Sequence, residues 1–304
     1  MAKMPISGAK AIEYVAEDSI GSGTYGVTPD NPTMKWLGLV NPFTPHIAKG
    51  YEEVRYLGAY DATDMLQKMR NMKVDGELTA SLTYKPQDWD FMQYITGSTT
   101  GLSDSVDSLS IAQYTDEKWI LYKGCMLTRW ELTLPKEGIA TVDVDMTIGD
   151  VADPTGTDFI GTGSHASEST DDPFLWEDIT GLKMDSNDPP TTEIAHSVGD
   201  LTLSITNEVE LPKDISSTKW TRAEGAVVKK RDISVSMELT WVDIDSFFTL
   251  VKNGTKQNLQ FTLGGKTFTI KGLIPPEYNP EITPDNFIGE TVTFLMDQPD
   301  LTIA

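Results

Sequence analysis

Apolar and polar residues alternate along several short stretches of the chain, and this period of two is typical of strands with one buried face. Residues 78–84 place apolar side chains at the even positions and Thr or Ser between them, and residues 140–148 and 259–263 alternate in the same way. Gly and Pro fall mostly between the apolar runs, which favours strands joined by turns over long helices. The pattern therefore predicts a mainly β protein whose strands cover a core on one face.

A block of 23 residues occurs twice without a gap, at residues 75–97 and 232–254. Each copy combines an alternating strand, a short helix and a glycine stop, with an aspartate placed as the helix N-cap. The caps are Asp88 and Asp245, and the stops are Gly97 and Gly254. We therefore expect two tandem β units, each with one short flanking α-helix. Duplication of a whole unit is more typical of assembly proteins than of single-site enzymes.

The length of 304 residues allows two domains with separate cores. The segment 150–173 is rich in Gly, Ser, Thr, Asp and Pro and has little apolar periodicity, so we interpret it as an interdomain connection. The expected division is an N-terminal arm at 1–32, a first β unit at 33–150, a linker at 151–175 and a second β unit at 176–304.

Two long polar stretches, at residues 49–73 and 207–231, precede the repeated strands and do not alternate for most of their length. In the first stretch, Asp61 is placed to cap a short helix whose apolar side includes Met69. Loops of this length in compact domains are usually functional or disordered. Because the two stretches occupy equivalent positions, we expect one role for both.

The formal net charge of -22 argues against binding the outside of a nucleic acid, which needs clustered Lys and Arg. It is compatible with a duplex passing nearby, because a wall of carboxylates repels phosphate and prevents sticking. Solubility and a saline host are alternative explanations of the same acidity.

Catalytic and cofactor motifs are weak. The G-x-G-x-x-G pattern at 21–26 is followed at once by prolines, where a dinucleotide fold needs a helix. The histidines are far apart in sequence and form no ligand-spaced cluster with Cys125, which we expect to be a small buried core residue. These histidines are His46, His165 and His196. We therefore expect no catalytic site, no cofactor and no metal.

No apolar stretch approaches the roughly 20 residues that span a membrane. The N-terminus MAKMPISGAK lacks the apolar core of a signal peptide. We expect no membrane insertion and synthesis in the host cytoplasm.

The N-terminal EDSIGSGTYGVTPDNP, the two repeated blocks and the closing ETVTFLMDQPDL together resemble the tail tube (major tail) proteins of long-tailed bacteriophages and related tailed viruses. The resemblance covers nearly the whole chain. It implies a virion tail protein built from β-sandwich or partial-barrel units. In that family the units join edge to edge into rings with a continuous inner β-barrel, and the rings stack through a long loop between strands.

The resemblance also implies roles for particular residues. Ring-stacking loops would contain Tyr51, Tyr56, Tyr60, Met65, Leu66, Lys213, Trp220 and Arg222. An inter-subunit arm would contain Tyr14, Ile20 and Tyr25. Lumen-facing carboxylates would be Asp143, Asp145 and Glu238.

The partner implied first is the chain itself. Six units usually make such a ring, so a duplicated chain predicts a trimer with pseudo-sixfold symmetry, and a hexamer of whole chains is the alternative. Tape-measure and tail terminator or distal tail proteins would join the assembly, and DNA would pass through an electronegative lumen without specific binding.

Two other classes of function stay open. A non-polymerising β-sandwich binding module, such as a capsid decoration or adhesin, would use exposed aromatics such as Trp176 and Trp220. A β-sandwich hydrolase would use the neighbouring carboxylates Asp143 or Asp145. The repeat and the lack of a catalytic motif favour a structural tube subunit over both.

Overall fold

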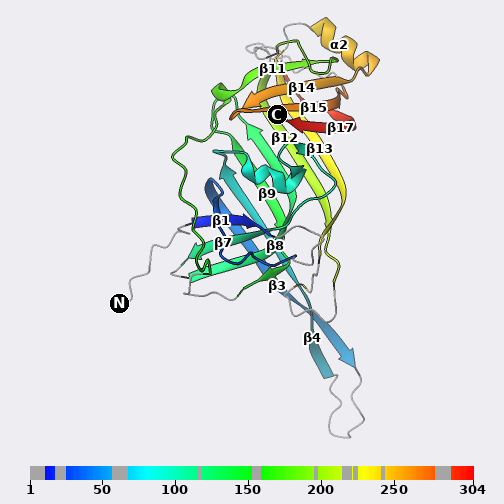
Figure 1. The fold of residues 1–304 in the computed structure, drawn as a ribbon. Helices are drawn as coiled ribbons and strands as arrows, with labels where there is room; N and C mark the ends of the chain where they lie inside the picture. The colour runs from blue at the N-terminus through cyan, green and yellow to red at the C-terminus, as the bar shows by residue number, and fades with distance from the viewer. Residues whose placement is uncertain are drawn as a thin grey trace, which may run out of the picture.

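The computed structural model describes residues 11–17, 25–56, 68–115, 118–152, 159–194, 198–213, 221, 225–240, 244–277 and 289–304. Strands dominate these residues and the helices are few and short, which confirms the prediction of a mainly β protein. The strands form two antiparallel sheets (Figure 1). The strands of the first half are β1 (Ala11–Ala16), β2 (Lys35–Trp36), β3 (Leu39–Tyr56), β4 (Lys68–Lys85), β5 (Gly97–Ser98), β6 (Gly101–Leu102), β7 (Leu109–Thr115), β8 (Lys118–Leu134), β9 (Thr141–Thr147) and β10 (Asp150–Val151).

The second half contributes β11 (Thr180–Asp185), β12 (Val198–Glu210), β13 (Val227–Thr240), β14 (Gln257–Leu263), β15 (Lys266–Ile274), β16 (Gly289–Thr293) and β17 (Leu295–Ile303). The helices are the 3-10 turns η1 (Asp90–Met92) and η2 (Trp176–Asp178) and the α-helices α1 (Gln93–Thr96) and α2 (Ile244–Asn253).

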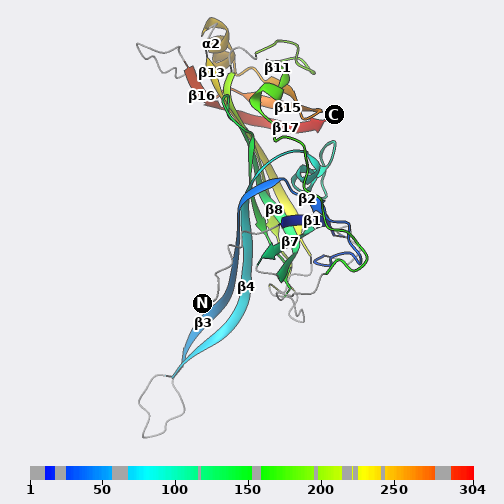
Figure 2. The same cartoon turned by 90° about the vertical axis from the view of Figure 1, so that its left-hand side faces the viewer.

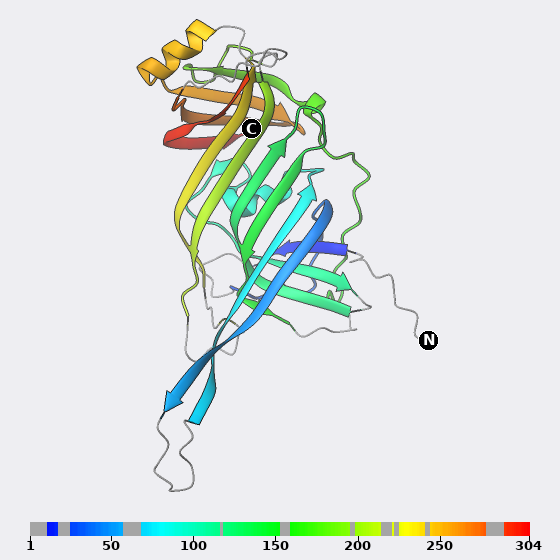
Figure 3. The same ribbon diagram turned by 180° about the vertical axis from the view of Figure 1, so that it is seen from behind.

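Seven strands lie side by side in what we call the central sheet, in the order β3-β4-β9-β8-β12-β13-β16 (Figure 3). The long strand β8 pairs with β9 and β12 along its C-terminal half and with β7 and β10 along its N-terminal half. Strands β1 and β2 continue from β7 as a side branch. Because β8 belongs to the first half of the chain and β12 to the second, the two halves share one sheet. The domain boundaries expected from the sequence remain predictions.

The second sheet has the order β11-β14-β15-β17-β6-β5. Most of its strands come from the second half, but Thr302 on β17 pairs with Gly101 on β6. The C-terminal strand therefore also joins the two halves.

One cluster of buried apolar residues connects both sheets. Trp89 lies at the junction, where its ring stacks on Phe174 with centroids 5.0 Å apart and meets Phe268 edge-on at 4.9 Å. The indole Nε1 of Trp89 donates to the carbonyl oxygen of Leu263 at 2.9 Å. The next residue, Gly264, has φ +57°, and a Cβ there would overlap the Phe174 ring. Glycine is therefore required at this close approach.

Both copies of the repeated block form a strand followed by a helix, β4 with η1 and α1, and β13 with α2. The predicted glycine stops are present, because Gly97 and Gly254 have φ of +83° and +59°. The expected N-cap Asp88 lies one residue too early, because η1 begins at Asp90 and its N-cap is Trp89, but the Asp88 carboxylate still accepts a hydrogen bond from the backbone amide of Asp90 at 3.0 Å. The expected N-cap Asp245 is wrong, because α2 begins one residue earlier and Asp245 lies in its first turn.

The β3–β4 hairpin extends far beyond the body of the protein (Figure 2). Its ladder continues until Tyr56 faces Lys68. The short helix expected to include Met69 is wrong at that residue, because Met69 pairs with Arg55 in the ladder. The rest of that expected helix lies outside the described residues. Neighbouring strands of the central sheet are antiparallel throughout. The connection between β12 and β13 therefore lies at the same end of the sheet as the connection between β3 and β4.

Candidate functional site

The central sheet has two chemically different faces. Along β9 the burial alternates strictly, so that Val142, Val144 and Met146 point into the core while the residues between them do not. The same alternation on β4, β8, β12 and β13 gives the sheet a second face of Thr, Ser and charged side chains, which we call the polar face. Its described acidic residues are Glu77, Glu131, Asp143, Asp145, Glu208, Asp232 and Glu238, and its described basic residues are Lys85, Arg129 and Lys230.

All three predicted lumen carboxylates lie on the polar face. Asp143 and Asp145 are neighbours on β9, whereas Glu238 lies on β13, with β8 and β12 between these strands. The hydroxyl of Thr83 donates to Asp143. The structure therefore brings two of the three carboxylates together.

Arg129 links the carboxylates at the middle of the polar face. Its guanidinium contacts Glu131 at 2.7 Å and Asp145 at 3.6 Å. The hydrogen bond that Arg129 donates to Glu131 and the nearby negative charges raise the pKa of Arg129 above its ordinary value. The guanidinium thus stays charged and contacts two carboxylates. The remaining acidic side chains leave the polar face with a net negative charge. A surface of hydroxyls and carboxylates repels phosphate and offers it few partners.

A shallow depression of about 340 Å³ lies on the polar face, over β3, β4, β8 and β9. Thr44, His46, Ser81 and Asp145 contribute to its lining. The lining combines hydroxyls, one imidazole and one carboxylate, without a hydrogen-bonded nucleophile and base. We therefore assign no catalytic role to it.

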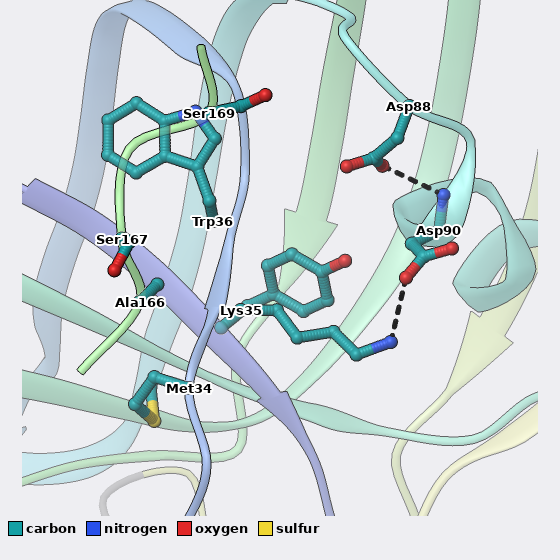
Figure 4. Close-up of a pocket in the computed structure, with 9 residues that line it drawn as sticks. Met34, Lys35, Trp36, Asp88, Asp90, Ala166, Ser167 and Ser169 are labelled. Atoms are coloured by element: carbon teal, nitrogen blue, oxygen red, sulfur yellow. Dashed lines mark hydrogen bonds and ion pairs between the residues drawn. The ribbon is translucent and has the colours of Figure 1, made fainter. Parts of the chain in front are cut away.

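A second pocket, of about 310 Å³, lies between β2 and η1 (Figure 4). Lys35 Nζ contacts the Asp90 carboxylate at 2.9 Å across this pocket. The Asp88 carboxylate accepts a hydrogen bond from the backbone amide of Asp90. Burial raises the pKa of Asp88, and the Asp90 amide opposes that shift. Tyr14 also lines the pocket, and its buried hydroxyl has no hydrogen-bond partner among the described residues. The charged groups of this pocket are thus occupied in holding η1 and β2 together.

The two sides of the central sheet end in strands with unpaired edges. Within the described residues β3 pairs only with β4, and β16 only with β13. Ile47 lies on β3 opposite the buried Leu78, hence on the apolar face, yet 44% of its surface is exposed. The apolar face thus continues to the β3 edge without full cover.

The residues expected in stacking loops are only partly described. Tyr51 and Tyr56 lie on β3 within the projecting hairpin, and Lys213 is exposed just after β12. The remaining residues of that set, Tyr60, Met65, Leu66, Trp220 and Arg222, lie outside the described residues.

The residues expected in an inter-subunit arm pack inside their own chain where they are described. Tyr14 lies on β1 and is fully buried, and Tyr25 is buried with its hydroxyl donating to the carbonyl oxygen of Gly124 at 2.8 Å. Neither ring is thus exposed to a neighbouring subunit. Ile20 lies outside the described residues.

A buried carboxylate that the sequence did not indicate explains how the start of the chain is held. Glu17 accepts the amides of Gly26 at 2.9 Å and Gly124 at 2.8 Å. It also accepts the hydroxyls of Ser108 and Ser110, each at 2.6 Å. Four donors satisfy the charge without a cation. Glu17 therefore fastens the segment after β1 to β7 and β8.

The remaining residues considered for catalysis or metal binding contribute to the fold instead. Cys125 is a buried core residue as predicted, and burial raises the pKa of its thiol. His165 Nδ1 contacts the buried carboxylate of Glu13 at 2.9 Å. The described residues contain no cluster of three or more side chains suited to hold a metal ion. No helix in the described part is long and apolar enough to cross a bilayer.

A family model described as phage tail tube protein matches residues 12–296, which is nearly the whole chain. No curated protein matches the chain. The match spans the central sheet, both hairpins and most of the second sheet.

Proposed function

The chain belongs to the phage tail tube protein family, and we propose that it polymerises edge to edge into rings that stack into a DNA-conducting tube. As a member of this family it is a structural protein of the virion tail. The observation that carries the proposal is the central sheet, which has one apolar face covered except near the β3 edge, one polar face, and two edges without a partner strand in the described part of the chain.

Pairing of the two sheet edges between neighbouring chains would close the ring. An unpaired edge strand exposes a row of amide and carbonyl groups, and pairing edges between copies removes this liability. In the proposed ring, the β3 edge of one chain meets the β16 edge of the next. The partly exposed Ile47 on β3 then becomes covered by the neighbouring chain.

The size of the closed barrel favours three chains. With strands about 4.8 Å apart and tilted by about 40°, three chains of seven strands close at roughly 40 Å between opposite backbones. Six chains would close at roughly 80 Å by the same geometry. After side chains fill part of the interior, the smaller barrel admits one duplex with little spare room. We therefore favour the trimer with pseudo-sixfold symmetry over the hexamer of whole chains.

The polar face is the surface that we assign to the lumen, with Asp143, Asp145 and Glu238 on it. Its carboxylates repel the phosphates of passing DNA, so the duplex slides without specific binding. The proposed role needs no catalysis or cofactor. Tape-measure and tail terminator or distal tail proteins are the further partners that a tube requires at its interior and ends.

The binding-module alternative gains no support from the described residues. Trp176 packs against the core, and Trp220 lies outside the described part. We therefore keep the tube as the proposed function.

Negative-stain electron microscopy of the purified protein across concentration and salt tests the proposal. We expect rings with a central hole and threefold symmetry, alone or stacked. A protein that stays monomeric under all conditions contradicts the proposal, and sixfold rings of whole chains contradict the trimer.

A further inference from the structure

The charge of the chain is distributed unevenly along the length of the central sheet. The connections of the β3–β4 and β12–β13 hairpins lie at one end of the sheet. The described residues at this end are 49–56, 68–73, 207–213 and 225–231, and we call them the basic hairpin end. These residues carry nine of the 24 Lys and Arg in the chain but only four of its 46 Asp and Glu. The basic hairpin end is therefore positive in a protein whose formal net charge is -22.

An acidic segment lies at the opposite end of the molecule. Residues 171–193, which we call the acidic strip, contain seven Asp and Glu and a single basic residue, Lys183. Leu175 in this strip bridges to Ile139 in the turn between β8 and β9, at the end of the central sheet away from the hairpins. The strip continues into β11, which Figures 1 and 2 place at the far end from the β3–β4 hairpin.

Much of the negative charge of the acidic strip is available to a partner. Asp171, Asp172 and Glu177 are exposed and form no ion pair with a described residue. Asp188 contacts Lys271 at 2.7 Å, and Glu193 reaches Lys183 only at 4.0 Å. The uncompensated carboxylates repel one another, so a basic surface placed over them lowers the electrostatic energy.

At the hairpin end, the described cation pairs are exposed and exchangeable. Lys229 contacts Glu210, and Lys230 contacts Asp232 at 2.7 Å, with at least half of each side chain exposed. Exposed pairs of this kind contribute little to stability. Their cations can therefore turn to carboxylates of another molecule at low cost.

We propose that the acidic strip is the docking surface for the basic hairpin end of a second copy of this chain in the next ring. The proposal rests on the proposed function and adds to it the chemistry of ring-to-ring recognition. Opposite charges attract when rings stack head to tail, and like charges meet when they stack head to head. The charge pattern thus sets a single polarity for the whole tube.

Charge reversal at each end, followed by reversal at both, tests this inference. Two changes per end would leave both net charges with their original sign, so each reversal takes four. The hairpin end is reversed by Lys68→Glu, Arg70→Glu, Lys229→Glu and Lys230→Glu. The strip is reversed by Asp171→Lys, Asp172→Lys, Glu177→Lys and Glu193→Lys. A chain with all eight changes restores opposite signs across the contact. Matched controls keep each charge at its position, with Lys and Arg exchanged at the four hairpin positions and Asp and Glu exchanged at the four strip positions. Ring formation is measured by native mass spectrometry and tube length by negative-stain electron microscopy.

We expect each single-ended reversal to yield rings but no tubes, while the eightfold variant and the controls form tubes like the wild type. Raising salt from about 0.1 M to about 1 M shortens the screening length roughly threefold and should dissolve wild-type tubes into rings. Tubes that persist in every variant and at high salt would overturn the electrostatic docking alone. A wild-type protein that never forms rings would instead overturn the proposed function.

Discussion

Replacing Ile47 with aspartate tests whether the β3 edge is an interface between copies. Ile47 is 44% exposed on the apolar face of β3, whose outer edge has no partner strand among the described residues. Fully burying an isoleucine contributes about 1.5–3 kcal/mol, so covering the exposed part contributes roughly 1 kcal/mol at each contact. An unpaired carboxylate at the same place adds several kcal/mol of desolvation cost. Each contact should therefore weaken by at least about 3 kcal/mol, which is a factor of about 100 in its dissociation constant.

The assay compares the protein concentration at which rings appear with the stability of the isolated chain. In the monomer, Ile47→Asp loses only the buried part of the side chain, so unfolding stability should fall by about 1 kcal/mol. Val27→Asp is a matched control, because Val27 is 48% exposed but lies outside the central sheet. We expect Val27→Asp to leave ring formation unchanged.

Two results would refute the reasoning. Rings that form at the wild-type concentration in the Ile47→Asp variant would show that the β3 edge is not covered on assembly. A variant that fails to form rings only because it is unfolded, as seen by circular dichroism, would show that Ile47 belongs to the monomer core. Ile47→Val should preserve both folding and rings.

Three further predictions concern the fold. Glu17→Gln should lower the free energy of unfolding by about 2–4 kcal/mol in urea, because four donors lose a charged acceptor, whereas the exposed Glu137→Gln should change it by less than about 0.5 kcal/mol. Gly264→Ala should lower the melting temperature more than Gly265→Ala, since both have positive φ but only the first Cβ meets side chains; equal shifts would contradict the close approach to Trp89. Burial raises the pKa of Cys125, so its thiol stays protonated and unreactive toward a thiol reagent at pH 8 in the native protein and reacts once after denaturation; rapid native reaction would contradict its burial.

The strands of the central sheet could be predicted from sequence because one of their faces meets a core. On β9, the core requires apolar residues at every second position, and the spacing of Asp143 and Asp145 therefore placed both on the polar face. The same logic failed for residues 49–56 and 68–73. Their hairpin extends beyond the body, so no core selects an alternating pattern there.

The bonds that fasten the chain could not be predicted, because they depend on residues distant in sequence. Glu17 lies in a polar segment typical of a loop, and its partner Gly124 is 107 positions away. The local pattern also placed the start of α2 two residues too late, with Asp245 as its N-cap, since helix ends depend on tertiary packing as well as on capping residues. The pairing of β8 with β12 had no local signal at all.

Because β8 pairs with β12, the proposed ring has two kinds of junction between β units, which we call seams. One seam, inside each chain, forms during folding and does not depend on protein concentration. The other, between β3 and β16 of neighbouring chains, forms by diffusion and bears the entropy of association. A ring of three chains therefore has only three interfaces between molecules, where a ring of six separate subunits has six. The inner seams should also resist bending, so that a curved tube strains first along the joints between molecules.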